Sequence, residues 1–205
     1  MSSVINQYYE HACRRPTDIY EHLPTLRAYA SECGVVAEMG VSTIVSTWAF
    51  LKGLTDSPVA PKKLICVDIE PTPKIVEVSA IAKNEGVELT FQQCDSVNAD
   101  LGDGVDMLFI DTWHVYGHLR RELAAHHAKT RRYIVMHDTT VDAIHGESVR
   151  CGSDVQLLMA QTGYSLTDVT TGLDRAIVEF LAEHPEWLLV AKYENNNGLT
   201  ILMRK

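Results

Sequence analysis

Long apolar runs are missing from this chain of 205 residues, and none approaches the roughly 18 residues that a membrane-spanning helix needs. The first residues, Met-Ser-Ser-Val-Ile-Asn-Gln, also lack the basic start and the apolar core of a secretory signal peptide. We therefore expect a soluble, cytoplasmic protein with no membrane partner.

Paired cysteines are missing as well. The five cysteines lie singly along the chain and form no CxxC pair, which argues against a disulfide framework and against a cysteine-built zinc site. Each is better explained as a small buried side chain in a reducing compartment.

Positive charge is scarce. The chain has 18 lysines and arginines against 27 aspartates and glutamates, a formal net charge of −9. An acidic surface repels phosphate backbones, so we expect no nucleic-acid partner. Repeats and low-complexity tracts are also absent, and a composition of 46% hydrophobic and 22% charged residues is typical of one compact globular domain.

What is present is an alternation of short apolar runs with helix-like segments. The expected strands are residues 35–39, 64–69, 87–92, 105–110 and 133–136, and the expected helices between them are residues 45–54, 74–84 and 117–128. The runs are apolar at successive positions, as expected for strands covered by helices on both faces. Repeated strand–helix units of this kind predict an α/β fold with a doubly wound, Rossmann-like parallel sheet.

The C-terminal part follows a different pattern. Residues 173–183 form a helix candidate, and two strand candidates follow at residues 187–193 and 199–203. Because Asn197-Gly198 is a strong signal for a tight turn, these strands should form an antiparallel hairpin after the five parallel strands. Residues 1–33 are expected to form an N-terminal helical preface, and residues 34–205 the main domain.

Polar residues occur where the expected strands end, and ligands of doubly wound sheets bind at the carboxyl ends of the strands. The first strand ends in Glu38, followed by Gly40 and Ser42. A glycine lets the backbone turn and approach a ligand, although a plain strand–helix connection explains it as well. The dinucleotide pattern GxGxxG is absent, since the loop after the first strand contains only one glycine.

The next two strand ends carry carboxylates. Asp68 is well placed to accept hydrogen bonds from the hydroxyls of a ribose, and Asp95, followed by Ser96, could accept one from an adenine amino group. The alternative for both aspartates is capping of the following helix.

The fourth and fifth strand ends carry most of the ionisable groups. Asp111 ends the fourth strand with His114 three residues later, and His137 and Asp138 end the fifth. If the two strands are neighbours, these side chains converge, because adjacent strands lie only about 5 Å apart. Two carboxylates so close repel each other unless a divalent cation compensates. Asp138 as a helix cap and His137 as a core histidine remain open alternatives.

These residues resemble a family. The segments 36–42, 107–116 and 134–139, together with the ending 193–200, are similar to class I S-adenosylmethionine-dependent methyltransferases. Within that class the chain looks like the small O-methyltransferases grouped with cephalosporin-hydroxylase-like and macrocin-type sugar methyltransferases, and like methyltransferase domains of chlorovirus glycan-synthesis proteins. The resemblance covers roughly residues 18 to 205.

The resemblance implies a role for each residue that matches a family motif. Its cofactor-binding residues would be Glu38, Gly40, Ser42, Asp68, Asp95, Ser96 and Asp111. Asp111, His137 and Asp138 would bind Mg²⁺ or Mn²⁺. His114, with Asp111, would be catalytic and would act as the general base in methyl transfer to a hydroxyl of a sugar or glycan.

The sequence departs from the family pattern at three points. The loop after Glu38 lacks the second and third glycines, Thr139 replaces an asparagine ligand of catechol-type enzymes, and histidine is a poorer ligand than carboxylate for a hard cation at His137.

The acceptor site is the least defined part of the sequence. Trp113, Tyr116, His145 and residues 142–152 are predicted to border it, and the last segment is either a mobile lid or a plain surface loop. Alternatives to a sugar enzyme are an O-methyltransferase of a phenol or small metabolite, an NAD-dependent oxidoreductase, and a catalytically silent nucleoside-binding domain. Whether the chain forms a homodimer or belongs to a larger glycan-synthesis protein stays open.

Overall fold

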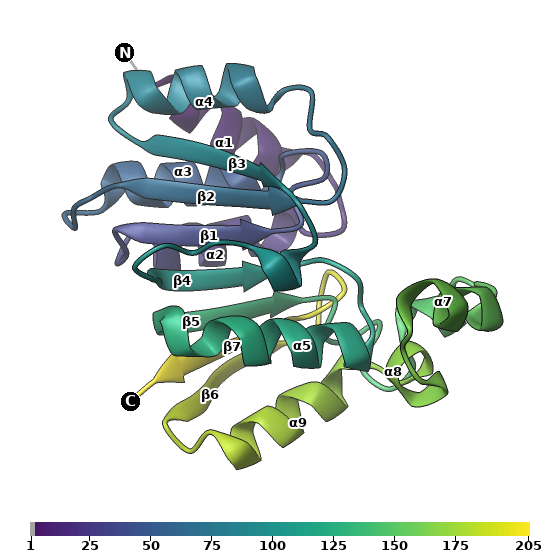
Figure 1. Ribbon diagram of the computed structural model, residues 1–205. Coiled ribbons are helices and arrows are strands. Elements are labelled where there is room, and N and C mark those ends of the chain that lie inside the picture. The colour runs from purple at the N-terminus through teal and green to yellow at the C-terminus, as the bar shows by residue number, and fades with distance from the viewer. Residues whose placement is uncertain (1–2) are drawn as a thin grey trace.

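The computed structural model describes residues 3–205, and within this range the chain folds around one seven-stranded sheet (Figure 1). Its strands are β1 (Val35–Met39), β2 (Lys63–Asp68), β3 (Glu88–Gln93), β4 (Val105–Ile110), β5 (Thr130–His137), β6 (Trp187–Tyr193) and β7 (Leu199–Arg204). Across the sheet they follow the order β3-β2-β1-β4-β5-β7-β6. Strands β1 to β5 pair in parallel, whereas β7 pairs antiparallel with both β5 and β6. The predicted parallel sheet with a C-terminal hairpin is confirmed.

Helices cover both faces of this sheet. The α-helices are α1 (Val4–Arg14), α2 (Leu23–Ala30), α3 (Ser46–Asp56), α4 (Ile75–Asn84), α5 (Tyr116–His126), α6 (Glu147–Arg150), α7 (Val155–Thr162), α8 (Leu166–Thr170) and α9 (Leu173–Glu183). Three short 3-10 helices are η1 (Tyr20–His22), η2 (Ser96–Asn98) and η3 (His127–Lys129) in the described part of the chain. None of the helices in residues 3–205 is long and apolar enough to span a bilayer.

Each face of the sheet has its own hydrophobic core. Val36 and Phe109 point into the core shared with α1 to α4, whereas Ala37 and Leu108 point into the core shared with α5 and α9. Successive side chains of a strand point to opposite faces, so a strand buried on both faces is apolar at every position. This explains why the central strands show no alternation in the sequence.

The N-terminal segment packs onto the first of these cores. The Ser3 side chain accepts a hydrogen bond from the backbone N–H of Asn6 and so caps α1, and Ile5 and Leu26 are fully buried. Met1 and Ser2, which belong to the expected preface of residues 1–33, lie outside the described residues.

Helices α6, α7 and α8 follow β5 and were not expected from the sequence. In α7 no residue is buried, and Leu157 is 53% exposed, so the segment lacks the apolar stripe that marks a helix packed on a core. Its ends carry signals that could have revealed it: the Asp154 side chain accepts from the N–H of Leu157, and Gly163 ends the helix with φ of 70°. Figure 1 shows α7 and α8 projecting beyond the carboxyl ends of the parallel strands.

Candidate functional site

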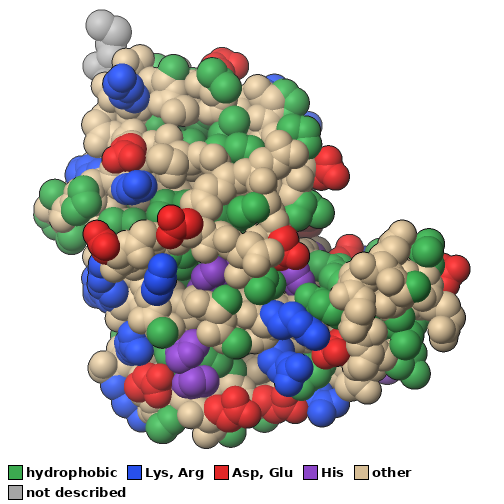
Figure 2. All heavy atoms as spheres, in the orientation of Figure 1, with side chains coloured by type: hydrophobic (Ala, Val, Ile, Leu, Met, Phe, Trp, Pro, Cys, Tyr) green, Lys and Arg blue, Asp and Glu red, His purple; other side chains and the backbone are tan. Residues whose placement is uncertain are grey.

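A cleft of about 740 Å³ lies between the carboxyl ends of the parallel strands and the α7–α8 projection, and Figure 2 shows a hollow there. Its volume is within the usual range for small-molecule sites, about 300 to 1,000 Å³. The predicted residues that line it are Gly40, Ser42, Asp68, Asp95, Ser96 and Asp111. The structure therefore brings residues from four strand ends to one cleft.

The loop after β1 is shaped by Gly40 and held by Asp68. Gly40 has φ of 86°, and a Cβ built on it would lie 1.8 Å from the carbonyl oxygen of Asp111. One carboxylate oxygen of Asp68 accepts hydrogen bonds from the N–H groups of Val41 and Ser42, both at 2.9 Å. Asp68 thus orders the loop while it lines the cleft, and its other oxygen accepts from the N–H of Glu70 at 3.0 Å.

Glu38 does not line the cleft, in contrast to its predicted contact with a cofactor. Its carboxylate is fully buried and accepts hydrogen bonds from the hydroxyls of Ser46 and Thr47 and from the thiol of Cys66. Burial raises the pKa of Glu38 to about 7 in spite of these three donors. Its contacts give Glu38 the role of joining β1 to the start of α3 beneath the cleft.

Two neighbouring residues at the third strand end differ in exposure. Asp95 is exposed and accepts a hydrogen bond from the N–H of Val97, so it caps η2 and also lines the cleft. The hydroxyl of Ser96 points instead into a buried network and donates to Glu122 at 2.6 Å. Glu122 also accepts from the hydroxyl of Thr112 at 2.7 Å, and burial raises its pKa.

An aromatic wall closes one side of the cleft. Trp113 stacks on Tyr164 with ring centroids 5.7 Å apart, and the guanidinium of Arg121 lies 3.8 Å from the centre of the Tyr164 ring. The Tyr164 hydroxyl is 3.2 Å from Nδ1 of His118. Trp113 was predicted to border the acceptor site, whereas Tyr164, His118 and Glu122 were not predicted as site residues. His118 and Glu122 are four residues apart and so lie on one helix face, and this spacing could have indicated that they act together.

The fourth and fifth strand ends meet as predicted, because β4 and β5 are paired neighbours. Nε2 of His114 lies 3.1 Å from a carboxylate oxygen of Asp111 and 3.1 Å from one of Asp138. Nδ1 of His137 lies 3.4 Å from Asp111 and 3.1 Å from Asp138. Asp138 has a positive φ of 56°, a strained conformation that is common at functional sites.

The charges in this cluster perturb one another strongly. Burial alone would lower the pKa of His114, but the carboxylates of Asp111, Asp142 and Asp138 outweigh it and raise the pKa to about 11. Burial also opposes the charged form of His137, yet Asp111 and Asp138 raise its pKa to about 10. Burial would raise the pKa of Asp111, but the two histidines hold it well below its usual range. Two cationic rings therefore balance the buried carboxylates.

The other nitrogen of His114 faces two further acids, both from the segment 142–152 that was predicted to border the acceptor site, although neither acid was singled out. Nδ1 is 3.4 Å from Asp142 and 3.6 Å from Glu147. Asp142 is fully buried, and the guanidinium of Arg150 donates to both of its carboxylate oxygens, at 2.6 and 2.8 Å. Carboxylates thus lie beside both ring nitrogens of His114.

Residues 142–147, part of the segment 142–152 that was predicted to be a lid or a surface loop, are hydrogen-bonded to the rest of the fold through their backbone. The N–H of Asp142 donates to the carbonyl of Asp138, and its carbonyl accepts from the N–H of Leu173. The N–H of Glu147 donates to the carbonyl of His114. These backbone bonds anchor the segment to both β5 and α9. His145, a predicted neighbour of the acceptor, is exposed and forms a β-bridge with Thr171.

Tyr116, which was predicted to border the acceptor site, does not line the cleft. It is 6% exposed, and its hydroxyl donates to Glu179 on α9 at 2.6 Å. The residue begins α5, and its ring lies between that helix and α9, where Arg175 lies 4.6 Å from its centre.

The donors around Asp111 suit a divalent cation. One ligand atom each from Asp111, His114 and Asp138 lie within 4.8 Å of one another. This grouping contains His114, whereas the predicted ligand set contained His137. Nδ1 of His137 is nevertheless buried and without a hydrogen-bond partner among the described residues, and it faces the same two carboxylates. Thr139 turns away from the cluster and accepts a hydrogen bond from Thr200.

Comparison with known proteins gives matches at the level of structure. No protein-family model matches the sequence. No curated protein matches it either. Among solved structures, an S-adenosylhomocysteine-bound methyltransferase of Podospora anserina aligns with a TM-score of 0.57 at 14% identity, covering 100% of this chain and 89% of that one.

Two further structures point the same way. An O-methyltransferase of Bacillus cereus in complex with S-adenosylhomocysteine aligns over 98% of this chain and 89% of its own, with a TM-score of 0.55 and 14% identity. The O-methyltransferase TomG of Streptomyces achromogenes, in complex with S-adenosylmethionine, aligns over 100% and 91% with a TM-score of 0.56 and 11% identity.

The fold is that of class I S-adenosylmethionine-dependent methyltransferases. In this methyltransferase fold β7 lies between β5 and β6 and runs against both, whereas a dehydrogenase-type sheet ends with a parallel sixth strand. The order of strands therefore disfavours the alternative of an NAD-dependent oxidoreductase.

Proposed function

We propose that this protein is an S-adenosylmethionine-dependent O-methyltransferase that acts on a hydroxyl of a sugar or glycan. One observation carries the proposal: the cleft lined by Gly40, Asp68 and Asp95 ends at Asp111, the residue that also contacts His114. A methyl donor bound along the strand ends would thus reach a cluster able to bind a cation and move a proton. The S-adenosylhomocysteine and S-adenosylmethionine complexes of the structural neighbours support this donor.

The residues that line the cleft can be matched to the parts of the methyl donor. Asp68 would accept from the ribose hydroxyls, and Asp95 would lie beside the adenine. Gly40 would lie beside the methionine part, and Asp111, whose backbone carbonyl packs against Gly40, also lines the cleft there. When bound, S-adenosylmethionine supplies a methyl group activated by a sulfonium sulfur, and its transfer to a hydroxyl releases one proton.

The chain's own residues fit a divalent cation beside this cleft. Asp111 and Asp138 would bind it, with His137 as a nitrogen ligand whose Nδ1 has no hydrogen-bond partner among the described residues. A bound Mg²⁺ or Mn²⁺ supplies positive charge that lowers the pKa of an acceptor hydroxyl and orients it. Mixed oxygen and nitrogen donors suit Mn²⁺ better than Mg²⁺.

His114 is the proposed base, and its environment sets the condition under which it can act. Surrounded by carboxylates alone, the ring is cationic and has no lone pair for a proton. Once Asp111 and Asp138 share their charge with a divalent cation, the ring can be neutral and take the hydroxyl proton at Nε2. Asp142 and Glu147 then hold the ring through Nδ1 and stabilise the imidazolium that forms.

The acceptor would lie between Trp113 and His114. A tryptophan ring can stack on the face of a sugar, and a sugar hydroxyl needs a base near neutral pH because it ionises poorly. The stacked Trp113–Tyr164 pair also suits a planar phenol, so a phenolic small molecule is the second candidate acceptor.

A labelled methyl donor offered with a panel of glycosides, catechols and nucleosides, with and without EDTA, tests the proposal. We expect label in a glycoside, slowing by EDTA, and recovery with Mn²⁺ or Mg²⁺. The His114→Ala variant should keep donor and Mn²⁺ affinity while losing most turnover, whereas His11→Ala, at an exposed histidine on α1, should behave as wild type. Loss of Mn²⁺ affinity in His114→Ala would instead make His114 a ligand. Absence of donor binding in the folded wild type would refute the proposal.

A further inference from the structure

A second group of metal-ligand side chains lies at the opposite edge of the sheet from the cleft. His127 belongs to η3, which follows α5 and precedes β5, and His184 and Glu186 belong to the loop between α9 and β6. These positions are at the amino end of β5, whereas the cleft lies at the carboxyl ends of the parallel strands. Figure 2 shows histidine side chains gathered on the surface over α5 and α9.

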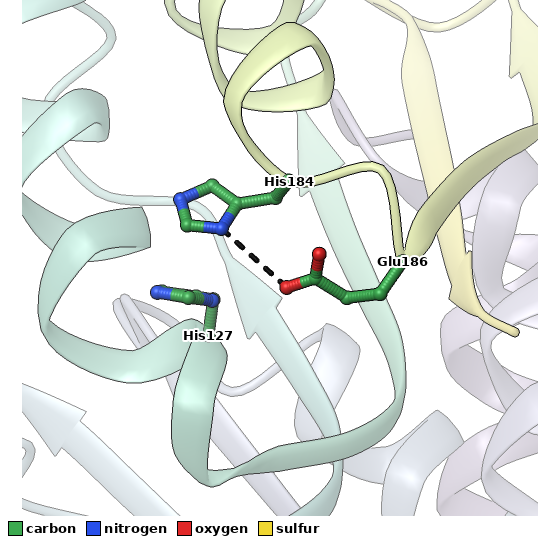
Figure 3. A group of neighbouring side chains, drawn as sticks. All are labelled: His127, His184 and Glu186. Atoms are coloured by element: carbon green, nitrogen blue, oxygen red, sulfur yellow. Dashed lines mark ion pairs between the residues drawn. The ribbon is translucent and has the colours of Figure 1, made fainter.

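The three side chains converge. Figure 3 shows both imidazole rings and the carboxylate turned toward one another, from two separate segments of the chain. Nδ1 of His184 is 3.4 Å from a carboxylate oxygen of Glu186, and the rings of His127 and His184 have centroids 4.1 Å apart. One ligand atom from each residue lies within 4.8 Å of the other two.

His127 brings an unused donor to this group. Its Nδ1 is buried and has no hydrogen-bond partner among residues 3–205, which is costly for a polar atom unless something else satisfies it. A neighbouring cation, Arg204, is engaged elsewhere: its guanidinium donates to the carbonyl of Thr130 at 3.0 Å and lies 5.4 Å from the centre of the Trp187 ring.

The backbone around the group is held by the fold. The N–H of His184 donates to the carbonyl of Phe180, and its carbonyl accepts from the N–H of Trp187, at 2.9 and 3.0 Å. The carbonyl of Glu186 accepts from the N–H of Lys205 at 2.9 Å. The loop is therefore tied to α9 on one side and to β7 on the other, and little reorganisation is needed to bring its ligands together.

We propose that His127, His184 and Glu186 bind a divalent transition-metal ion of the zinc type. Two imidazoles and one carboxylate are a known three-ligand set for Zn²⁺, with metal–ligand distances of about 2.0 to 2.2 Å. Ligand atoms of a tetrahedral site at such distances are roughly 3.4 Å apart, which matches the separation between His184 and Glu186. The ion would link the end of α5 to the loop before β6.

This site is separate from the cation proposed for the cleft, and its donors differ. The cleft group contains two carboxylates together with a histidine nitrogen, whereas this group contains two histidines and one carboxylate. Mg²⁺, which prefers oxygen ligands, should therefore bind this second group more weakly than the cleft group. The inference does not depend on the proposed methyl transfer.

Titration of ZnCl₂ into the full chain by calorimetry, in an Asp138→Asn background that weakens the cleft group, tests the proposal. We expect one Zn²⁺ per chain, a higher melting temperature with Zn²⁺, and no response to MgCl₂. Adding His184→Ala or Glu186→Gln should weaken Zn²⁺ binding at least tenfold and abolish the thermal shift. Adding His11→Ala, an exposed histidine on α1, should change neither.

Circular dichroism would confirm that each variant is folded, and Glu186→Gln keeps the size and shape of the side chain. The proposal would be overturned if adding both Glu186→Gln and His184→Ala to the Asp138→Asn variant left its Zn²⁺ affinity unchanged. It would also be overturned if a folded Asp138→Asn chain bound no Zn²⁺.

Discussion

Gly40 and Asp111 lie so close that a methyl group on the glycine would stand 1.8 Å from the carbonyl oxygen of the aspartate. They end neighbouring strands, since β1 pairs with β4. The N–H of Asp111 also donates to the carbonyl of Met39 at 2.8 Å. The backbone that brings Asp111 to the cleft is thus the same backbone that leaves no room for a side chain at position 40.

Replacing Gly40 by alanine should therefore destabilise the fold as well as the cleft. We expect a loss of more than about 2 kcal/mol in the free energy of unfolding, because backbone must move in addition to the unfavourable φ of 86°. Urea denaturation measures it. Gly86 is a matched control with φ of 81°, and no atom of residues 3–205 lies within 4 Å of a Cβ built there, so Gly86→Ala should cost only about 1–2 kcal/mol. Equal losses of stability in Gly40→Ala and Gly86→Ala would contradict the close contact between Gly40 and the backbone of Asp111.

Glu38 should make stability depend on pH. Burial raises its pKa in the folded chain to about 7 from an ordinary value of 4.5, so the folded state holds its proton more tightly than the unfolded state. The stabilisation is complete below pH 4.5 and is lost as the pH rises to 7. Glu38→Gln cannot ionise, so its stability relative to wild type should rise by about 2 to 3 kcal/mol between pH 5 and pH 8. Urea denaturation of both proteins across this range tests it, and a constant difference would show that Glu38 does not titrate there.

Asp68 should contribute to donor affinity through its carboxylate. Asp68→Asn retains one oxygen for the N–H groups of Val41 and Ser42. It loses the charge that favours bonds from ribose hydroxyls and the second oxygen, which accepts from the N–H of Glu70. Loss of a hydrogen bond to a charged group costs about 1.5–3 kcal/mol, so S-adenosylhomocysteine should bind at least about tenfold more weakly. Calorimetry with this ligand gives the measurement. Asp174→Asn, which removes only a surface ion pair with Lys192, should bind like wild type.

Asp142 should act on turnover through His114. Asp142→Asn removes the negative charge 3.4 Å from Nδ1, so a protonated ring would be less stabilised and kcat should fall by about tenfold or more. Affinity for S-adenosylhomocysteine should stay unchanged, because Asp142 does not line the donor cleft. Arg150→Gln provides a comparison that keeps the carboxylate and loses its partner. A fall in donor affinity parallel to the fall in kcat would indicate a general structural defect instead.

The sheet was predictable because the sequence patterns that mark its strands are local. The strands at residues 35–39, 105–110 and 187–193 begin and end where expected, since burial on both faces leaves an apolar run and polar residues mark its end. The start of β5 was missed by three residues because Arg131 and Arg132 are exposed at its edge and interrupt the apolar run. Helix α7 was missed because it projects from the body and buries none of its residues.

The candidate site was predictable where a residue ends a strand or follows it within a few positions. Asp68, Asp111 and Asp138 meet this condition, because the carboxyl ends of parallel strands share one edge. Asp142 and Tyr164 reach the site from segments between β5 and α9, and no local pattern indicates where such segments pack.

By itself, the sequence determined the alternation of strands and helices, the final hairpin and the set of acids at the strand ends, because these depend on burial and on near neighbours in the chain. Tertiary structure alone decided that Glu38 is sealed beneath the cleft, that Tyr116 turns toward α9, and that His127 meets His184 and Glu186. The physical reason is that side-chain direction and long-range proximity follow from how helices pack on the sheet. Packing depends on the whole core and not on any one segment.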